Sequence, residues 1–352
     1  MVTGPDGALS LPWLRPVLDR ALAQVRGHST LVHGPGGVGQ FELAIALAQA
    51  WLCEAEGPGQ RPCGRCAACH LMQARMHPDF HLLLPDALRE PLGWGGDAEG
   101  GAKEGGEGKK AKPSREVRVE AVRAAIDWSQ QTSSRGKGKV VVIHPAQAMN
   151  AIAANALLKT LEEPPGSVRL LLCTHDPESL LPTIRSRCQR LAVPRPERAV
   201  ALAWLEAQGA READVLYDAS GEQPLEAVAM LRVGIDAAAW RRLPASLQRG
   251  EASALTPWPL PRAIDALQKL CHDLMAAAVG APARYFAAAD LPPGAALPAL
   301  AGWQASLRRA ARHDEHPWNA PLLVEALVAE GRALWPPARA GTPHRLGTLS
   351  SR

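Results

Sequence analysis

Short apolar runs alternate with segments of helical periodicity through the amino-terminal half of the chain, and this alternation constrains the fold most. Strands are predicted at 30–33, 80–84, 139–143 and 169–174. Helical spacing of apolar residues predicts helices at 41–52, 118–130 and 146–161. Nearly continuous apolar strands joined by helices indicate a parallel sheet covered on both faces. We therefore predict a doubly wound α/β domain over residues 1–193.

The sequence changes character at Val193–Pro196, after which helical patterns replace strand patterns. Helices are predicted at 197–208, 212–219, 225–233, 263–279, 297–312 and 321–334. A small helical domain at 194–235 and a larger helical domain at 236–335 are expected. Eight glycines in the sixteen residues 93–108 predict a disordered insertion at about 90–115, and the Pro/Gly/Ser-rich end predicts a disordered tail at 336–352.

Composition excludes several classes of protein. The chain has 352 residues, 47% of them hydrophobic, which is enough to build a core without disulfides. Its formal net charge of +4 is too small to indicate nucleic-acid binding by itself. The first residues lack the pattern of a secretory signal, and the longest uncharged run, 140–158, contains polar residues and a proline. A soluble, cytoplasmic protein without membrane contacts is expected.

Four of the seven cysteines fall within 17 residues, at Cys53, Cys63, Cys66 and Cys69. In a cytosolic chain such a cluster indicates metal binding rather than disulfides, and four thiolates complete a closed tetrahedral zinc site. An iron–sulfur cluster is the alternative, but its motif has a further cysteine three residues on, where this chain has His70–Gln73. We predict a structural zinc module at 53–69. The remaining cysteines are expected to be buried side chains.

A glycine-rich loop joins the first predicted strand to the first predicted helix. Its glycines are Gly34, Gly36, Gly37 and Gly39, the frame of a phosphate-binding P-loop. Gln40 stands where a P-loop has lysine, and Phe41 stands where it has serine or threonine. The charge that neutralises phosphate and the hydroxyl that binds Mg²⁺ are both missing. A dinucleotide fingerprint is the weaker alternative, because no acidic residue closes a second strand at the expected distance.

The strand predicted at 139–143 also lacks residues that a phosphoryl-transfer site needs. In a phosphoryl-transfer site it would end in Asp-Glu, which binds Mg²⁺ and activates water, but here it ends in His144 and Pro145. Two independent parts of the site are therefore absent together. This combination favours a nucleotide-binding fold that has lost catalysis.

Two further strings carry a resemblance to a known family. Asn155–Pro165 (NALLKTLEEPP) and Thr183–Cys188 (TIRSRC), together with the P-loop-like segment and the cysteine cluster after its helix, resemble the clamp-loader branch of the AAA+ ATPases. The similarity runs from about residue 12 to residue 325. It implies that 1–193 is an AAA+ domain, 194–235 a lid domain and 236–335 a collar domain. It also implies a subunit that does not hydrolyse ATP.

The resemblance implies partners and roles for single residues. The partners would be motor (gamma/tau) and delta subunits, and the assembly would load a sliding clamp onto primed DNA as an accessory to a DNA polymerase, a nucleotidyltransferase. Arg187 would be an arginine finger for the ATP site of a neighbouring motor subunit; otherwise it belongs to a basic surface patch. Thr174 and the segment 221–227 occupy the sensor positions, but the arginine expected in the second is not evident.

Some alternatives remain open. Lys159 could contact DNA or a partner, or be only solvated. The chain could be an ATP-hydrolysing gamma/tau-type subunit, or a stand-alone zinc protein that binds nucleic acid.

Overall fold

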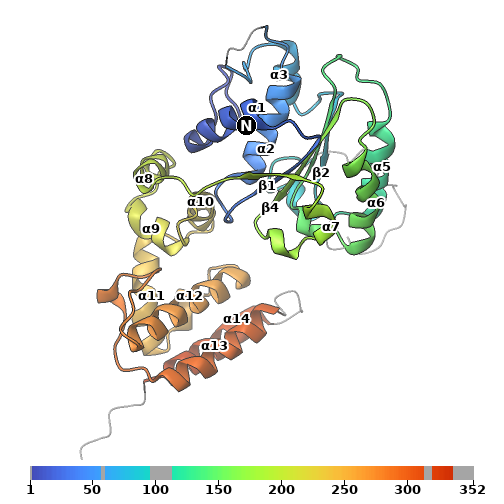
Figure 1. Ribbon diagram of the computed structural model, residues 1–352. Helices are drawn as coiled ribbons and strands as arrows, with labels where there is room; N and C mark the ends of the chain where they lie inside the picture. The colour runs from blue at the N-terminus through green and yellow to red at the C-terminus, as the bar shows by residue number, and fades with distance from the viewer. Residues whose placement is uncertain (1, 57–59, 96–112, 313–318, 336–352) are drawn as a thin grey trace, which may run out of the picture. The chain divides into compact units, whose positions relative to one another are not determined.

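The computed structural model describes residues 2–56, 60–95, 113–312 and 319–335 (Figure 1). The core of the predicted insertion, 96–112, and the predicted tail, 336–352, lie outside these residues. Contacts divide the chain into two compact units. The first is Met1–Ala207 with Gln223–Glu226, and the second is Gln208–Glu222 with Ala227–Arg352. The division into three domains stays a prediction.

The first unit is built on a five-stranded parallel sheet in the order β2-β3-β4-β1-β5. Its strands are β1 (Ser29–His33), β2 (Phe80–Leu83), β3 (Lys139–Ile143), β4 (Val168–Thr174) and β5 (Gln189–Ala192). β4 is the central strand of this order, and β1 is an interior strand that pairs with β4 on one side and with the edge strand β5 on the other. The sheet confirms the predicted α/β class, and it brings the carboxyl ends of β1, β3 and β4 to one edge.

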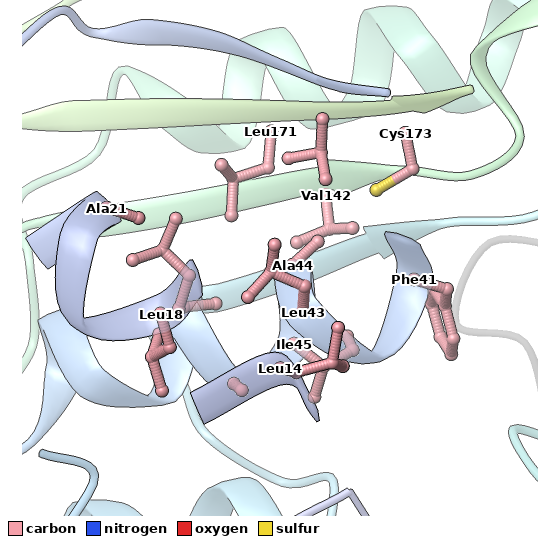
Figure 2. Packing of buried hydrophobic residues seen from close by; sticks show 14 of the residues in the cluster. Leu14, Leu18, Ala21, Phe41, Leu43, Ala44, Ile45, Val142, Leu171 and Cys173 are labelled. Atoms are coloured by element: carbon pink, nitrogen blue, oxygen red, sulfur yellow. The ribbon is translucent and has the colours of Figure 1, made fainter. Parts of the chain in front are cut away.

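Helices cover both faces of the sheet (Figure 1). α1 (Arg15–Gln24) and α2 (Gln40–Leu52) pack on one face, and α5 (Val119–Ser129) and α6 (Ala151–Glu162) pack on the other. Successive strand residues point to opposite faces of the sheet, so Val142 packs in the core under α1 and α2, whereas Val141 packs in the core under α5 and α6. Figure 2 shows the first core, where Leu18 and Leu43 lie against Leu171 of the sheet.

Shorter elements complete this unit. The helices are α3 (Ala67–Gln73), α4 (Asp86–Arg89), α7 (Pro182–Arg185) and α8 (Arg198–Ala207). Single-turn 3₁₀ helices lie at Pro12–Leu14, Ala146–Ala148 and Pro177–Ser179. α8 opens the predicted lid domain, yet it belongs to the first unit, where Trp204 packs edge-on against Trp13 with ring centroids 5.2 Å apart.

The structure corrects several sequence expectations in this unit. The predicted helix 146–161 is a 3₁₀ turn followed by α6, because Asn150 caps α6 by accepting a hydrogen bond from the N–H of Ala153. The predicted disorder does not begin at 90: residues 90–95 are described, and Trp94 packs on Phe80 with ring centroids 5.8 Å apart. α1, α3 and β5 were not predicted from the sequence.

The second unit is helical. Its helices are α9 (Ala213–Ala219), α11 (Ala237–Arg249), α12 (Leu260–Ala278), α13 (Leu297–Arg312) and α14 (Ala320–Arg332), with 3₁₀ turns at Ala252–Ala254 and Ala288–Asp290. α10 (Pro224–Arg232) starts in the segment grouped with the first unit. The core includes Trp240, stacked on Phe286, and Trp303. Buried Asp273 accepts hydrogen bonds from the backbone N–H groups of residues 284–286.

None of the helices in the described ranges is both long and apolar enough to cross a membrane. The cytoplasmic location stays a prediction.

Candidate functional site

The glycine-rich loop joins β1 to α2 with backbone that only glycine adopts easily. Gly37 and Gly39 have φ angles of +65° and +103°, in the left-handed region. The loop is also tightly enclosed: a Cβ on Gly34 would lie 2.2 Å from the carbonyl oxygen of Val193. All four predicted glycines, Gly34, Gly36, Gly37 and Gly39, therefore lie in one P-loop-shaped turn at the amino end of a helix.

Gln40 fills the position of the P-loop lysine, and its side chain folds back onto the loop. The Nε2 group donates hydrogen bonds to the carbonyl oxygens of Gly34, at 2.6 Å, and of Pro35. The side chain is 6% exposed. These contacts tie the loop to the start of α2, and they offer a phosphate no positive charge.

A second segment of the chain covers the loop. The N–H of Leu225 donates to the carbonyl oxygen of Gly37 at 3.1 Å. A Cβ on Gly37 would lie 2.9 Å from the Cβ of Gln223. A Cβ on Gly36 would lie 3.2 Å from Oε1 of the same glutamine. The segment 221–227, predicted at the second sensor position, thus brings an amide rather than an arginine to the phosphate loop.

Two rings occupy the place where a metal ion would sit between a P-loop hydroxyl and the acidic end of β3. Phe41 and His144 pack with ring centroids 4.8 Å apart and planes tilted by 32°. Phe41 is 5% exposed. Burial, with a smaller contribution from His175, lowers the pKa of His144 to about 4, so its ring is neutral at pH 7. The pair is an apolar contact in place of a magnesium site.

The other predicted nucleotide-sensing residue has a structural partner. Thr174 ends β4, is buried, and its hydroxyl accepts a hydrogen bond from the N–H of Asp176 at 3.0 Å.

Glu42, which follows Phe41 on α2, was not considered from the sequence, and burial raises its pKa.

Arg187 follows α7, and its guanidinium contacts Glu162 at the end of α6. Nε and Nη2 both approach Glu162 Oε1, and Nη1 donates to the carbonyl oxygen of Thr183 at 2.9 Å. The side chain is 32% exposed. The acidic partner was missed from the sequence, since it lies 25 residues away. Spacing carries no signal for such a pair.

The residues of α6 that belong to the NALLKTLEEPP string differ in exposure. Asn155 and Lys159 are exposed, whereas Thr160 is buried. Only the first two could meet a partner or DNA.

The four clustered cysteines converge, as predicted. The Sγ atoms of Cys53, Cys63, Cys66 and Cys69 lie within 4.8 Å of one another, and no disulfide joins them. Two of the pairs are 3.9 Å apart. A tetrahedral zinc site with Zn–S bonds of about 2.3 Å has sulfur–sulfur edges of about 3.8 Å. The donor set and its spacing could therefore hold a metal ion.

The backbone around these sulfurs is arranged for anionic ligands. The N–H of Cys66 points at Cys63 Sγ and the N–H of Cys69 at Cys66 Sγ, each at 3.4 Å. Burial opposes ionisation at Cys63, but hydrogen bonds from the N–H groups of Arg65 and Cys66, and from the thiols of Cys53 and Cys66, lower its pKa to about 6. Burial raises the pKa of Cys53 and of Cys69. Four thiolates at these distances need a cation to offset their repulsion.

The cysteine centre is fixed to its surroundings on two sides. Gly64 has φ of +74°, and a Cβ there would lie 2.7 Å or less from backbone atoms of Gly4, Pro5 and Gly7. On the other side, Glu54 accepts from the N–H of Ala68 and pairs with Arg135 at 2.6 Å. The centre thus joins the end of α2, α3 and the first residues of the chain.

The comparisons with known proteins show the family of the chain. A family model described as "DNA polymerase III, delta subunit" matches residues 15–197, more than half of the chain. The DNA polymerase III subunit delta' of Pseudomonas aeruginosa is 37% identical over 226 residues, 61% of this chain and 60% of the relative. That of Escherichia coli is 31% identical over 280 residues, 73% of this chain and 76% of the relative.

Relatives with another name also match. The gamma/tau subunit of DNA polymerase III from Mycobacterium bovis is 29% identical over 212 residues, 58% of this chain but only 32% of the relative. The delta' matches are higher in identity and cover more of their own length. The chain belongs to the DNA polymerase III delta prime (delta') family.

Proposed function

We propose that this chain is a non-catalytic delta prime subunit of a DNA polymerase III clamp loader. The observation that carries the proposal is the closed phosphate loop. Gln40 is turned onto the loop carbonyls, and the Phe41–His144 ring pair occupies the metal position. A subunit built this way binds no ATP–Mg²⁺ productively, so its contribution to the reaction is made at the site of a neighbour.

That contribution is assigned to Arg187. A guanidinium supplied from an adjacent subunit stabilises charge on the γ-phosphate in the transition state, which is worth about 10³–10⁵ in rate. Arg187 is partly exposed and its side chain is held by Glu162 and the carbonyl oxygen of Thr183. This hold orients the group before a partner arrives, and the partner's phosphate then competes with Glu162 for it.

The metal is proposed to be zinc with a structural role. Four thiolates leave no open coordination position, which excludes a metal-activated water at this centre. The ion would fasten the end of α2 to α3 and to the first residues of the chain. With the other subunits, the motor (gamma/tau) and delta chains, the assembly would open the sliding clamp and place it on primed DNA.

Reconstitution tests the proposal. The clamp loader is assembled with wild-type chain, with Arg187→Ala, or with Arg185→Ala as the matched control, since Arg185 lies two residues before Arg187 and pairs with a different acid, Glu178. Arg187→Ala is expected to lower ATPase stimulation by DNA and clamp at least about tenfold at one motor site. The control should retain wild-type stimulation. Equal rates in the wild type and Arg187→Ala would remove the finger.

The isolated chain separates this proposal from the gamma/tau alternative. Purified chain without partners is expected to turn over no ATP above a metal-chelated blank. Steady turnover would assign the chain to the motor subunits, whatever the Arg187 variants show.

A further inference from the structure

The first unit contains a cavity that no step above uses. Its volume is about 760 Å³, within the range of ~300–1,000 Å³ typical of small-molecule sites. Its walls come from α1, the carboxyl end of α2, residues 60–61, Lys137 before β3, and Arg169 near the start of β4. Because the strands are parallel, this is the edge of the sheet opposite the phosphate loop. The two sites lie at opposite ends of α2, about 18 Å apart along the helix.

The cavity is strongly basic. Five cationic side chains line it, and the single carboxylate among the lining residues, Asp19, is already paired with Arg15 at 2.6 Å. The other cations are Arg26, Arg61, Lys137 and Arg169. In the part of the chain that the structure describes, no carboxylate pairs with any of these four. The uncompensated charge of the lining equals the formal +4 of the whole chain.

Two of the cations are held in place by contacts other than ion pairs. The guanidinium of Arg169 lies over the Trp51 ring, 4.4 Å from its centroid. Arg61 donates through Nη2 to the carbonyl oxygen of Ala55 at 2.6 Å, while its buried Nε finds no hydrogen-bond partner among the residues that the structure describes. A buried donor without a partner costs free energy unless a ligand or solvent accepts from it. The donors are therefore fixed in advance of an acceptor.

The like charges also act on one another. Burial, and then the charge of Arg26, lower the pKa of Arg169. Purely structural cations are normally paired with carboxylates when they approach this closely. Here the described residues supply no carboxylate partner to Arg26 or Arg169, and an anionic ligand would relieve the repulsion between them.

We propose that this cavity is a binding site for a compact ligand with two or more phosphate groups. A guanidinium group can donate two parallel hydrogen bonds to two oxygens of one phosphate. Lys137, whose side chain is exposed, adds a point charge at the rim of the cavity. The same chemistry could be presented by a free nucleotide or polyphosphate, or by the phosphorylated 5′ end of a nucleic-acid strand. The proposal is independent of the assignment of Arg187 and of the cysteine centre.

Calorimetric titration of the full chain tests this site. The probes are inorganic tripolyphosphate, ATP, and a short single-stranded oligonucleotide with and without a 5′-phosphate. The variant is Arg26→Gln/Lys137→Gln, which removes two exposed cations whose side chains have no other described partner. The control, Arg20→Gln/Arg123→Gln, removes the same charge from exposed positions of α1 and α5 outside the cavity.

Saturable binding of tripolyphosphate by the wild type is expected, weakened at least about tenfold by the cavity variant and less than about twofold by the control. ATP binding with the same pattern would assign the site to free nucleotides. A preference for the 5′-phosphorylated oligonucleotide, lost in the cavity variant, would assign it to strand ends. The proposal is overturned if no probe binds saturably, if the cavity variant binds as the wild type does, or if both variants lose affinity equally.

Discussion

Restoring the P-loop consensus is expected to destabilise the protein without making it an ATPase. The change is Gln40→Lys/Phe41→Ser, which writes a working P-loop end into the existing glycine frame. It deletes a ring that is 5% exposed and packed 4.8 Å from His144. It also places an ammonium where the amide now donates to Gly34 and Pro35.

The cost follows from the buried ring. Removing a buried Phe side chain typically lowers the free energy of unfolding by about 3–5 kcal/mol, through lost transfer free energy and the cavity left behind. Serine leaves a hydroxyl in that cavity, so the upper part of the range is expected. Phe41→Leu is the matched control, because it keeps an apolar side chain and should cost less than about 1.5 kcal/mol.

Amide hydrogen exchange of peptides from β1, β3 and α2 measures the loss in free energy of unfolding in the elements around residue 41. A loss of about 3 kcal/mol makes globally protected amides exchange at least about a hundredfold faster, whereas Phe41→Leu should change them about tenfold or less. ATP turnover should stay at the blank in both, because β3 still ends in His144 rather than a carboxylate. An unchanged exchange rate, or ATP turnover by the double variant, would refute this reasoning about the closed loop.

Three other outcomes are expected. Chelation of the metal, or Cys63→Ser, should lower the thermal midpoint and expose the peptides of α3 first; a chelator-treated chain with an unchanged midpoint would contradict a structural metal. Stability should fall as the pH drops from about 6.5 to about 4, because the unfolded chain protonates His144 there and the folded chain does not; His144→Gln should flatten that slope in unfolding titrations. Asp273→Asn should cost about 2–3 kcal/mol, since the asparagine amide replaces only one of the two carboxyl oxygens that accept from three N–H groups, and unaltered denaturant midpoints would argue against it.

The sequence predicted the parts of the fold whose signal is local. Runs such as 139–143 and 169–174 are mostly apolar on both faces, which is the pattern expected of a strand buried in a parallel sheet. The cysteine centre was equally visible, because four ligands of one type sit within 17 residues. Both predictions depended on residues close together in the chain.

The missed parts depend on distant contacts. In β5 only Leu191 is buried, and the strand exists because Thr30 to His33 offer it an edge to pair with. α11 carries Pro244 in its interior, which weakens any local helical signal, and its core side chain Trp240 stacks on Phe286, 46 residues later in the chain. The Arg187–Glu162 pair and the basic cavity share this property, since each is assembled from separate segments.

The strand order has a consequence for how this chain folds during synthesis. β1 is among the earliest elements to leave the ribosome, but both of its neighbours come late: Ser29 pairs with Leu170, and Thr30 pairs with Gln189. Until about half the protein has been made, this interior strand has two unpaired edges and an apolar helix, α2, beside it. Such non-local pairing slows folding and exposes aggregation-prone surface. The four cysteines are complete by residue 69, so the nascent chain can close this small centre long before the sheet.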